Sequence, residues 1–209
     1  MYLIDKTYFQ GKINVPNSDE FNGEFDSSLE MAIDKYAPLF LQNVLGAVLF
    51  NELNPFIVGV NLDPLAPQKW KDLIDGVVYD DGKKVWKGLR YSTGLHKESV
   101  LAYFVYLNYY QETNSSGVGQ VVDIAKNGIN ANPTQHLTEV YNIFVELYQS
   151  DRYCYGAERS YINGALFIDY YNNRKNSGFV SLLEFLQDNK DIYIGYTANQ
   201  IAYKNQLGI

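Results

Sequence analysis

The sequence predicts a mainly α-helical fold, a helical bundle with a small β-hairpin near residues 77–86 and extended arms at both termini. Apolar residues recur at steps of three and four over long stretches, and one short stretch changes to a strand-like pattern around an Asp-Gly turn. With 209 residues, 46% of them hydrophobic, the chain can bury a core without disulfides. We expect an N-terminal arm at 1–24, a helical core domain at 25–190 and a C-terminal tail at 191–209.

The first long helix is expected to begin near Ser27, because Ser27 and Glu30 have the spacing of a capping box. A broad apolar stripe at helical spacing follows. Pro38 lacks an N–H group and Gly46 is a poor helix former. We therefore expect either a kink or two consecutive helices that end near Asn54.

The middle of the chain alternates short elements with one long helix. After a loop at 61–67, a short helix is expected at 67–74, ended by Gly76. The hairpin at 77–86 follows, with Asp-Gly in its turn. A second long helix is expected at 97–112, and its apolar and tyrosine residues surround it, so it should be buried nearly all round.

Two breaks rich in glycine and asparagine, at 114–119 and 128–133, precede the next helix. Asn132 and Pro133 suit an N-cap and a first helical residue, and the stripe that follows allows this helix to extend to Asn172. A last short helix is expected at 180–189, followed by the aromatic tail.

Composition argues against several classes of protein. Seventeen basic and 24 acidic residues give a net charge of −7, which disfavours a nucleic-acid coat held by phosphate contacts. Cys154 is the single cysteine, so no intramolecular disulfide can form and a reducing compartment is expected. We see no signal peptide at the N-terminus and no apolar run long enough to span a membrane, so no membrane association is expected.

Few segments suggest a ligand. The G-x-G of 116–120 lacks a third glycine and a preceding strand, so a flexible turn is favoured over a dinucleotide loop. The segment Asp80-Asp81-Gly82 lacks the order of a calcium loop, and a hairpin turn is favoured. Two carboxylate pairs, Asp80 with Asp81 and Asp188 with Asp191, are interpreted as solvated faces rather than as catalytic acids.

Cys154 could pair with His96 or His136 in a nucleophilic dyad. A cysteine between tyrosines is more often a small packed apolar residue, and both histidines stand beside expected helix starts, where they suit surface or capping roles. We therefore assign no catalytic, cofactor-binding or metal-binding residue, expect no cofactor, and expect a protein that is not an enzyme.

Tyrosine is unusually abundant, with 19 residues. Protein interfaces are enriched in tyrosine because its ring gives contact area at low entropic cost. A codon bias toward Tyr, Asn, Lys and Ile explains the abundance equally well. The clusters are Tyr103, Tyr106, Tyr109 and Tyr110; Tyr153, Tyr155 and Tyr161; Tyr170 and Tyr171; and Tyr193, Tyr196 and Tyr203.

One distributed pattern extends over most of residues 29–209. It comprises Leu41-x-x-Val44-Leu45-Gly46, Leu49-x-x-Glu52-Leu53, Pro67-x-x-Trp70-x-x-Leu73-x-x-Gly76, Trp86-x-Gly88-Leu89, a tyrosine-rich helix, Thr113-x-x-x-Gly117, Asn132-Pro133, Leu182-Leu183-Glu184-Phe185-Leu186 and Asn205-Gln206-Leu207-Gly208. This pattern resembles that of the small head-to-tail connector (adaptor) proteins of tailed bacteriophages, those of crAss-like phages in particular. Pro38, inside the first expected helix, departs from it.

The resemblance implies a mainly helical subunit that forms a homo-oligomeric ring, usually of twelve copies, in the neck of the virion after synthesis in the host cytoplasm. Its partners would be the portal protein and other neck or tail proteins, with DNA passing through the lumen without sequence-specific binding. No active site comes with the resemblance. An acidic wall would repel passing DNA. Two alternatives remain open: a small cysteine-dependent hydrolase and a monomeric phage-encoded host-interaction protein.

Overall fold

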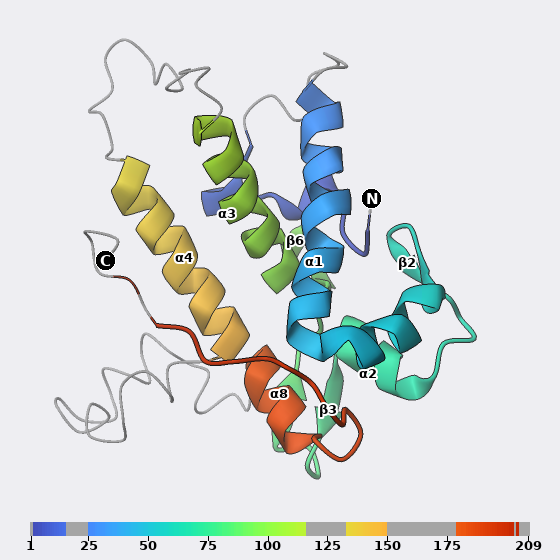
Figure 1. Ribbon diagram of the computed structural model, residues 1–209. Coiled ribbons are helices and arrows are strands. Elements are labelled where there is room, and N and C mark those ends of the chain that lie inside the picture. The colour runs from blue at the N-terminus through green and yellow to red at the C-terminus, as the bar shows by residue number, and fades with distance from the viewer. Residues whose placement is uncertain (1, 16–24, 116–132, 150–178, 203, 205–209) are drawn as a thin grey trace, which may run out of the picture.

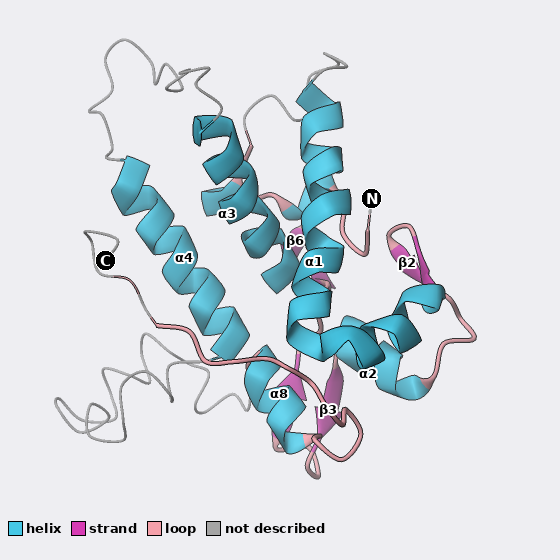
Figure 2. Cartoon of the chain, in the orientation of Figure 1, coloured by secondary structure: helices cyan, strands magenta, loops and turns pink. Residues whose placement is uncertain are grey.

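The computed structural model describes residues 2–15, 25–115, 133–149, 179–202 and 204 (Figure 1). These residues form five α-helices and three separate two-stranded antiparallel sheets (Figure 2). The fold is therefore mixed, and the prediction of a mainly helical bundle with one hairpin is wrong. The helices are α1 (Phe25–Leu53), α2 (Gln68–Asp75), α3 (Val100–Ser115), α4 (Pro133–Gln149) and α8 (Leu182–Asp188). The strands are β1 (Ile57–Val58), β2 (Asn61–Leu62), β3 (Val77–Tyr79), β4 (Lys84–Trp86), β5 (Tyr91–Thr93) and β6 (His96–Glu98).

The long helices form a layer in which α3 lies between α1 and α4, while α8 packs at the end of α4 (Figure 1). Phe40 of α1, Phe104 of α3 and Phe144 of α4 meet in this layer. Their ring centroids are 5.1 Å apart for Phe40 and Phe104, and 5.9 Å apart for Phe104 and Phe144. These separations are those of favourable aromatic pairs, so one aromatic cluster joins all three helices. Helix α3 is buried or half-buried from Val100 to Tyr110, as predicted.

Helix α1 begins at Phe25, two residues before the predicted start at Ser27, and includes Pro38. It is broken at Gly46, whose φ of 77° and ψ of 166° are not helical. The expected interruption is thus confirmed at Gly46, whereas Pro38, which was also expected to interrupt the helix, lies within it. Thr197 caps the exposed carbonyls at this break: its N–H donates to Val44 at 2.8 Å and its hydroxyl donates to Asn43 at 2.7 Å.

Helix α2 and the β3–β4 hairpin form one unit, both close to their predicted bounds. The helix ends at Gly76, and β3 pairs with β4 in the register Val77 with Trp86. The C-terminal carbonyls of α2 need partners. Leu73 O accepts from the Trp86 indole at 2.9 Å and from the backbone N–H of Leu89 at 3.2 Å. The chain after the hairpin therefore completes the end of the helix.

The two other hairpins, β1–β2 and β5–β6, were not predicted from the sequence. Each of their strands has only two or three residues, which is too short for a period of two to be recognised. Gly94, at a φ of 58°, begins the turn of the second hairpin. Helix α3 consequently starts at Val100 rather than at 97, and the Ser99 hydroxyl accepts from the N–H groups of Leu101 and Ala102 at 3.1 and 3.3 Å.

The described part of the N-terminal arm is not extended, because it forms two short 3-10 helices that pack on the core, whereas residues 196–202 of the tail have no regular secondary structure. The segment 2–15 is tied down by a hydrogen bond from Leu3 N–H to Gly59 O at 2.9 Å. Tyr193, after α8, is 1% exposed, and its hydroxyl donates to Lys69 O at 2.5 Å. The N-terminal residues that join the core are Leu3, Ile4, Tyr8, Phe9 and Ile13. The predicted extension of α4 to Asn172 lies outside the described residues.

Candidate functional site

The residues of the proposed cysteine dyad are not brought together in the described part of the chain. Cys154 and the G-x-G segment 116–120 lie outside it. His96 is exposed on β6 with its ring 6.5 Å from that of Tyr91. His136, on α4, has Nε2 3.2 Å from the hydroxyl oxygen of Tyr106 on α3, within hydrogen-bond distance. Each histidine thus packs against a different tyrosine on a different element.

The carboxylates Asp80 and Asp81 form the turn of the β3–β4 hairpin, both exposed and both at a φ of 53°. The hairpin-turn interpretation is confirmed. Asp188 lies against this hairpin. Its Oδ2 accepts from the Tyr79 hydroxyl at 2.7 Å and from the Lys84 ammonium at 2.6 Å. Within the described residues, no cluster of three or more His, Cys, Asp or Glu side chains could hold a metal ion.

This contact shifts two pKa values upward. Burial, followed by the hydrogen bond to Asp188, raises the pKa of Tyr79. The hydrogen bond to Asp188 raises the pKa of Lys84, against a smaller opposing effect of burial. The contact links α8 to the β3–β4 hairpin.

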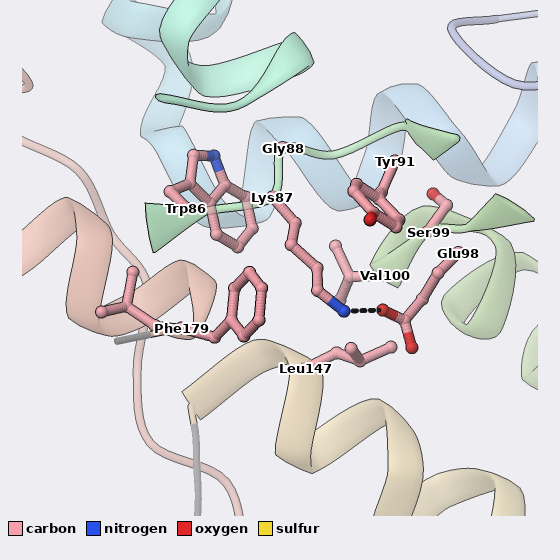
Figure 3. Close-up of a pocket in the computed structure, with 10 residues that line it drawn as sticks. Trp86, Lys87, Gly88, Tyr91, Glu98, Ser99, Val100, Leu147 and Phe179 are labelled. Atoms are coloured by element: carbon pink, nitrogen blue, oxygen red, sulfur yellow. Dashed lines mark hydrogen bonds and ion pairs between the residues drawn. The ribbon is translucent and has the colours of Figure 1, made fainter. Parts of the chain in front are cut away.

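A small pocket of about 30 Å³ lies where the β4–β5 segment meets α4 and the chain before α8 (Figure 3). Lys87 is one of its lining residues. Its Nζ lies 3.0 Å from Oε2 of Glu98 and 4.9 Å from the ring centroids of both Tyr91 and Phe179. The ammonium is neutralised by the carboxylate and held between two aromatic faces. Ligand pockets are about tenfold larger, so this feature joins elements rather than binding a substrate.

The described tyrosine clusters lie mainly against the chain's own core. Tyr106 and Tyr193 are buried. Tyr103, Tyr109, Tyr110 and Tyr196 are half-buried and pack against the same core. These tyrosines therefore contribute to the core of the chain's own fold. The clusters at 153–171 and Tyr203 lie outside the described residues.

Two leucines stand out instead, because they are almost fully exposed. Leu95 is 94% exposed at the turn of the β5–β6 hairpin. The backbone of this hairpin is fixed: the Gln10 amide donates to Leu95 O at 3.2 Å, and Lys97 lies 3.9 Å from Asp5 in an ion pair. Leu95 is therefore held outward by a structured turn.

Leu65 is 87% exposed in the loop between β2 and α2, and its backbone is fixed in a similar way. Its N–H donates to Oδ1 of Asp63 at 2.8 Å, and the Lys71 ammonium donates to Pro64 O at 2.8 Å. The sequence shows that Leu65 lies in a turn-forming segment. It does not show that the side chain is exposed, because exposure depends on how the loop is attached to the rest of the fold. A fixed, exposed apolar side chain suits a protein interface because little entropy is lost on binding.

Comparison with protein-family models, with curated proteins and with solved structures finds no match to this chain. Among the described residues, no helix is both long and apolar enough to cross a membrane.

Proposed function

We propose that this chain is a non-enzymatic structural subunit, a head-to-tail adaptor of a tailed bacteriophage that forms a ring below the portal and joins capsid to tail. The observation that carries the proposal is the pair of exposed leucines on fixed loops, Leu65 and Leu95. The resemblance in sequence pattern supplies the class of assembly.

A closed ring of identical subunits requires two different patches, one of which meets the other on the next copy. Leu65 and Leu95 lie on two separate loops, each braced by its own hydrogen bonds, so they can serve two different contacts. Burying one leucine contributes about 1.5–3 kcal/mol. This is too little to assemble a subunit alone, so we expect a portal to template the ring by allowing many weak contacts at once.

Charge affects the assembly in the opposite direction. The net charge of −7 is repeated in every copy and disfavours closure of the ring. Salt screens this repulsion beyond about 8–10 Å, so association is expected to strengthen as salt is raised from low concentration. The same acidic charge would keep DNA from adhering to the lumen.

The test measures mass by light scattering, with and without portal, across a range of salt concentrations. We expect a ring with portal for the wild-type chain and its loss in Leu65→Ser and Leu95→Ser, with unfolding midpoints unchanged. Met31→Ser is the matched control, since Met31 is also exposed, at 64%, but lies on helix α1. A wild-type chain that never joins the portal under any condition would overturn the proposal, in which case a monomeric host-interaction role becomes the better interpretation.

A further inference from the structure

The end of the tail, residues 196–202 and 204, meets α1 at the break in that helix and continues along α4 without regular secondary structure (Figure 1). Thr197 is the residue at the break. Its N–H donates to Val44 O at 2.8 Å, and its hydroxyl donates to Asn43 O at 2.7 Å. One tail residue therefore serves two successive carbonyls of the first part of α1.

These two carbonyls have other donors in a continuous helix. There each carbonyl accepts from the N–H four residues later, so Asn43 O would accept from Ala47 and Val44 O from Val48. Thr197 supplies the same number of donors from outside the helix. Val44 is buried, at 3% exposed, and a buried carbonyl that loses its donor is unfavourable. The tail thus satisfies in the bent helix what a continuous helix would satisfy from within.

Gly46 is compatible with both forms of α1. Glycine adopts positive φ about as readily as helical φ, so its φ of 77° does not by itself fix the bend. The bend is favoured by Leu49 and Leu53, which follow it and are 4% and 0% exposed. A continuous helix would turn both leucines away from the positions that they hold in the core. Burial therefore favours the bend, and Thr197 compensates for the helical bonds that the bend costs.

We propose that residues 196–202 and 204 act as a strap that holds α1 bent at Gly46, and that release of this strap gives α1 access to a second form, continuous through Gly46. A docked strap then goes with a bent helix, and a released strap with a continuous one. Such coupling acts equally in both directions. Whatever detaches the strap shifts the helix, and whatever straightens the helix loosens the strap.

The strap has one fixed end and one end that can be released. Tyr193, just before it, is 1% exposed, and its hydroxyl donates to a backbone oxygen of α2 at 2.5 Å. The other end is held by polar contacts alone among those described here. Gln149 donates to Ile201 O at 2.5 Å and accepts from its N–H at 2.6 Å, and Asn142 makes the same two bonds with Lys204, both at 3.1 Å. Water replaces such bonds at small net cost, so this end can detach while Tyr193 stays in place.

The bend at Gly46 also sets the direction of α2. Glu52, in the second part of α1, pairs with Lys69 of α2 at 2.8 Å, so α2 follows that part of the helix. Leu65 lies in the loop that leads into α2. If Leu65 makes a contact between subunits, release of the strap would redirect that contact. This consequence rests on the proposed function, whereas the strap itself does not.

The distance between two spin labels on α1 measures the bend. The labels are attached to Met31→Cys and Asn51→Cys, both at exposed positions, in a full-length Cys154→Ser chain. In a continuous helix these positions, 20 residues apart, would lie about 30 Å from each other. The bend shortens this distance. Pulsed electron paramagnetic resonance on the isolated protein records the populations.

Two substitutions at Thr197 test the strap. Thr197→Pro removes both donors at once and should add a population near 30 Å to the single shorter distance of the wild type. Thr197→Ser keeps the N–H and the hydroxyl, so it is the matched control and should retain the wild-type distance. Thr197 is exposed, so neither change removes a core residue. A Thr197→Pro chain with the wild-type distance alone would overturn the proposal, as would a wild-type chain with the long distance.

Gly46→Ala tests the coupling from the other side. A Cβ atom at this position would lie 3.1 Å from Cγ2 of Thr197, and alanine disfavours the positive φ. The variant should raise hydrogen exchange at the amides of Ile201 and Lys204, which lie beside α4, at least tenfold. Gly82→Ala has the same sign of φ in open space and should leave that exchange unchanged.

Exchange in a folded Gly46→Ala chain that stays at the wild-type rate would overturn the coupling. If Gly46→Ala does not fold, as judged by circular dichroism, the two Thr197 variants decide the question. Both measurements use the isolated protein, so they are independent of the portal. A fixed bend would overturn the strap and leave the adaptor proposal standing, and failure to join the portal would do the reverse.

Discussion

Gly76 and Gly88 cross so closely that a Cβ atom on Gly88 would lie 2.6 Å from the backbone nitrogen of Gly76. Both residues have positive φ, at 90° and 91°, so each position requires glycine for its conformation as well as for space. The crossing lets the N–H of Arg90 reach Ile74 O at 3.1 Å, at the end of α2. This bond and the one from Leu89 N–H to Leu73 O join α2 to the chain between the β3–β4 and β5–β6 hairpins.

Gly88→Ala is expected to lower the free energy of unfolding by about 3 kcal/mol or more, because it adds overpacking against backbone to an unfavourable φ. Gly82→Ala is the matched control: Gly82 has a φ of 83° but no atom within 4 Å of its Cβ position. That variant should lose only about 1–2 kcal/mol. Urea denaturation of both variants measures the difference. Equal losses in the free energy of unfolding would show that the close approach of Gly88 to Gly76 does not contribute to the effect.

The two tryptophans should respond differently to replacement by phenylalanine. Trp86 donates its indole N–H to Leu73 O and stacks on Phe185 at a centroid distance of 5.5 Å. Trp70 is fully buried, but its indole N–H has no hydrogen-bond partner among the described residues. Removing an unsatisfied donor relieves a desolvation cost, whereas removing Trp86 leaves a carbonyl with one bond fewer. Trp86→Phe should therefore be the more destabilising by about 1 kcal/mol in thermal or chemical unfolding.

The N-terminal segment should behave as part of the core rather than as an arm. Ile4 is 0% exposed, so Ile4→Ala is expected to cost about 2–4 kcal/mol of stability. Met31→Ala, on the exposed side of α1, should change stability by less than about 0.5 kcal/mol. Trypsin digestion of the isolated protein provides a second readout. Rapid cleavage after Lys6 or Lys12 in a folded wild-type chain would contradict this packing.

Stability should fall at alkaline pH through buried tyrosines. Burial raises the pKa of Tyr106 to about 12, above the value of 10.0 expected in the unfolded chain. Its contribution is fully present below pH 10 and is lost as the pH rises from 10 toward 12. Between pH 9 and 11.5 the wild-type chain should lose roughly 2 kcal/mol more than Tyr106→Phe. Denaturation midpoints of the two proteins at pH 9 and pH 11.5 measure this difference. If both proteins lose the same stability between these pH values, the Tyr106 hydroxyl is in contact with water.

The helices could be predicted because their signals are local. Gly76 ends α2, Asp-Gly turns the β3–β4 hairpin and Pro133 begins α4, and each signal acts on residues within one or two turns. The start of α3 was placed three residues early because the polar segment before it forms β6. The candidate site was not predicted, since the sequence drew attention to tyrosines that turned out to pack on the core.

The order of the helices, the β3–β4 hairpin and the break in α1 at Gly46 can be predicted from the sequence, because apolar period and glycine conformation are properties of neighbouring residues. The remaining features depend on contacts between segments that are distant along the chain. Strands of two or three residues carry no period, so β1–β2 and β5–β6 depend on contacts such as Leu3 with Gly59 that are distant along the chain. The tail's position likewise depends on Asn142 and Gln149, whose amides bind backbone and so leave no mark on the sequence of the segment they hold.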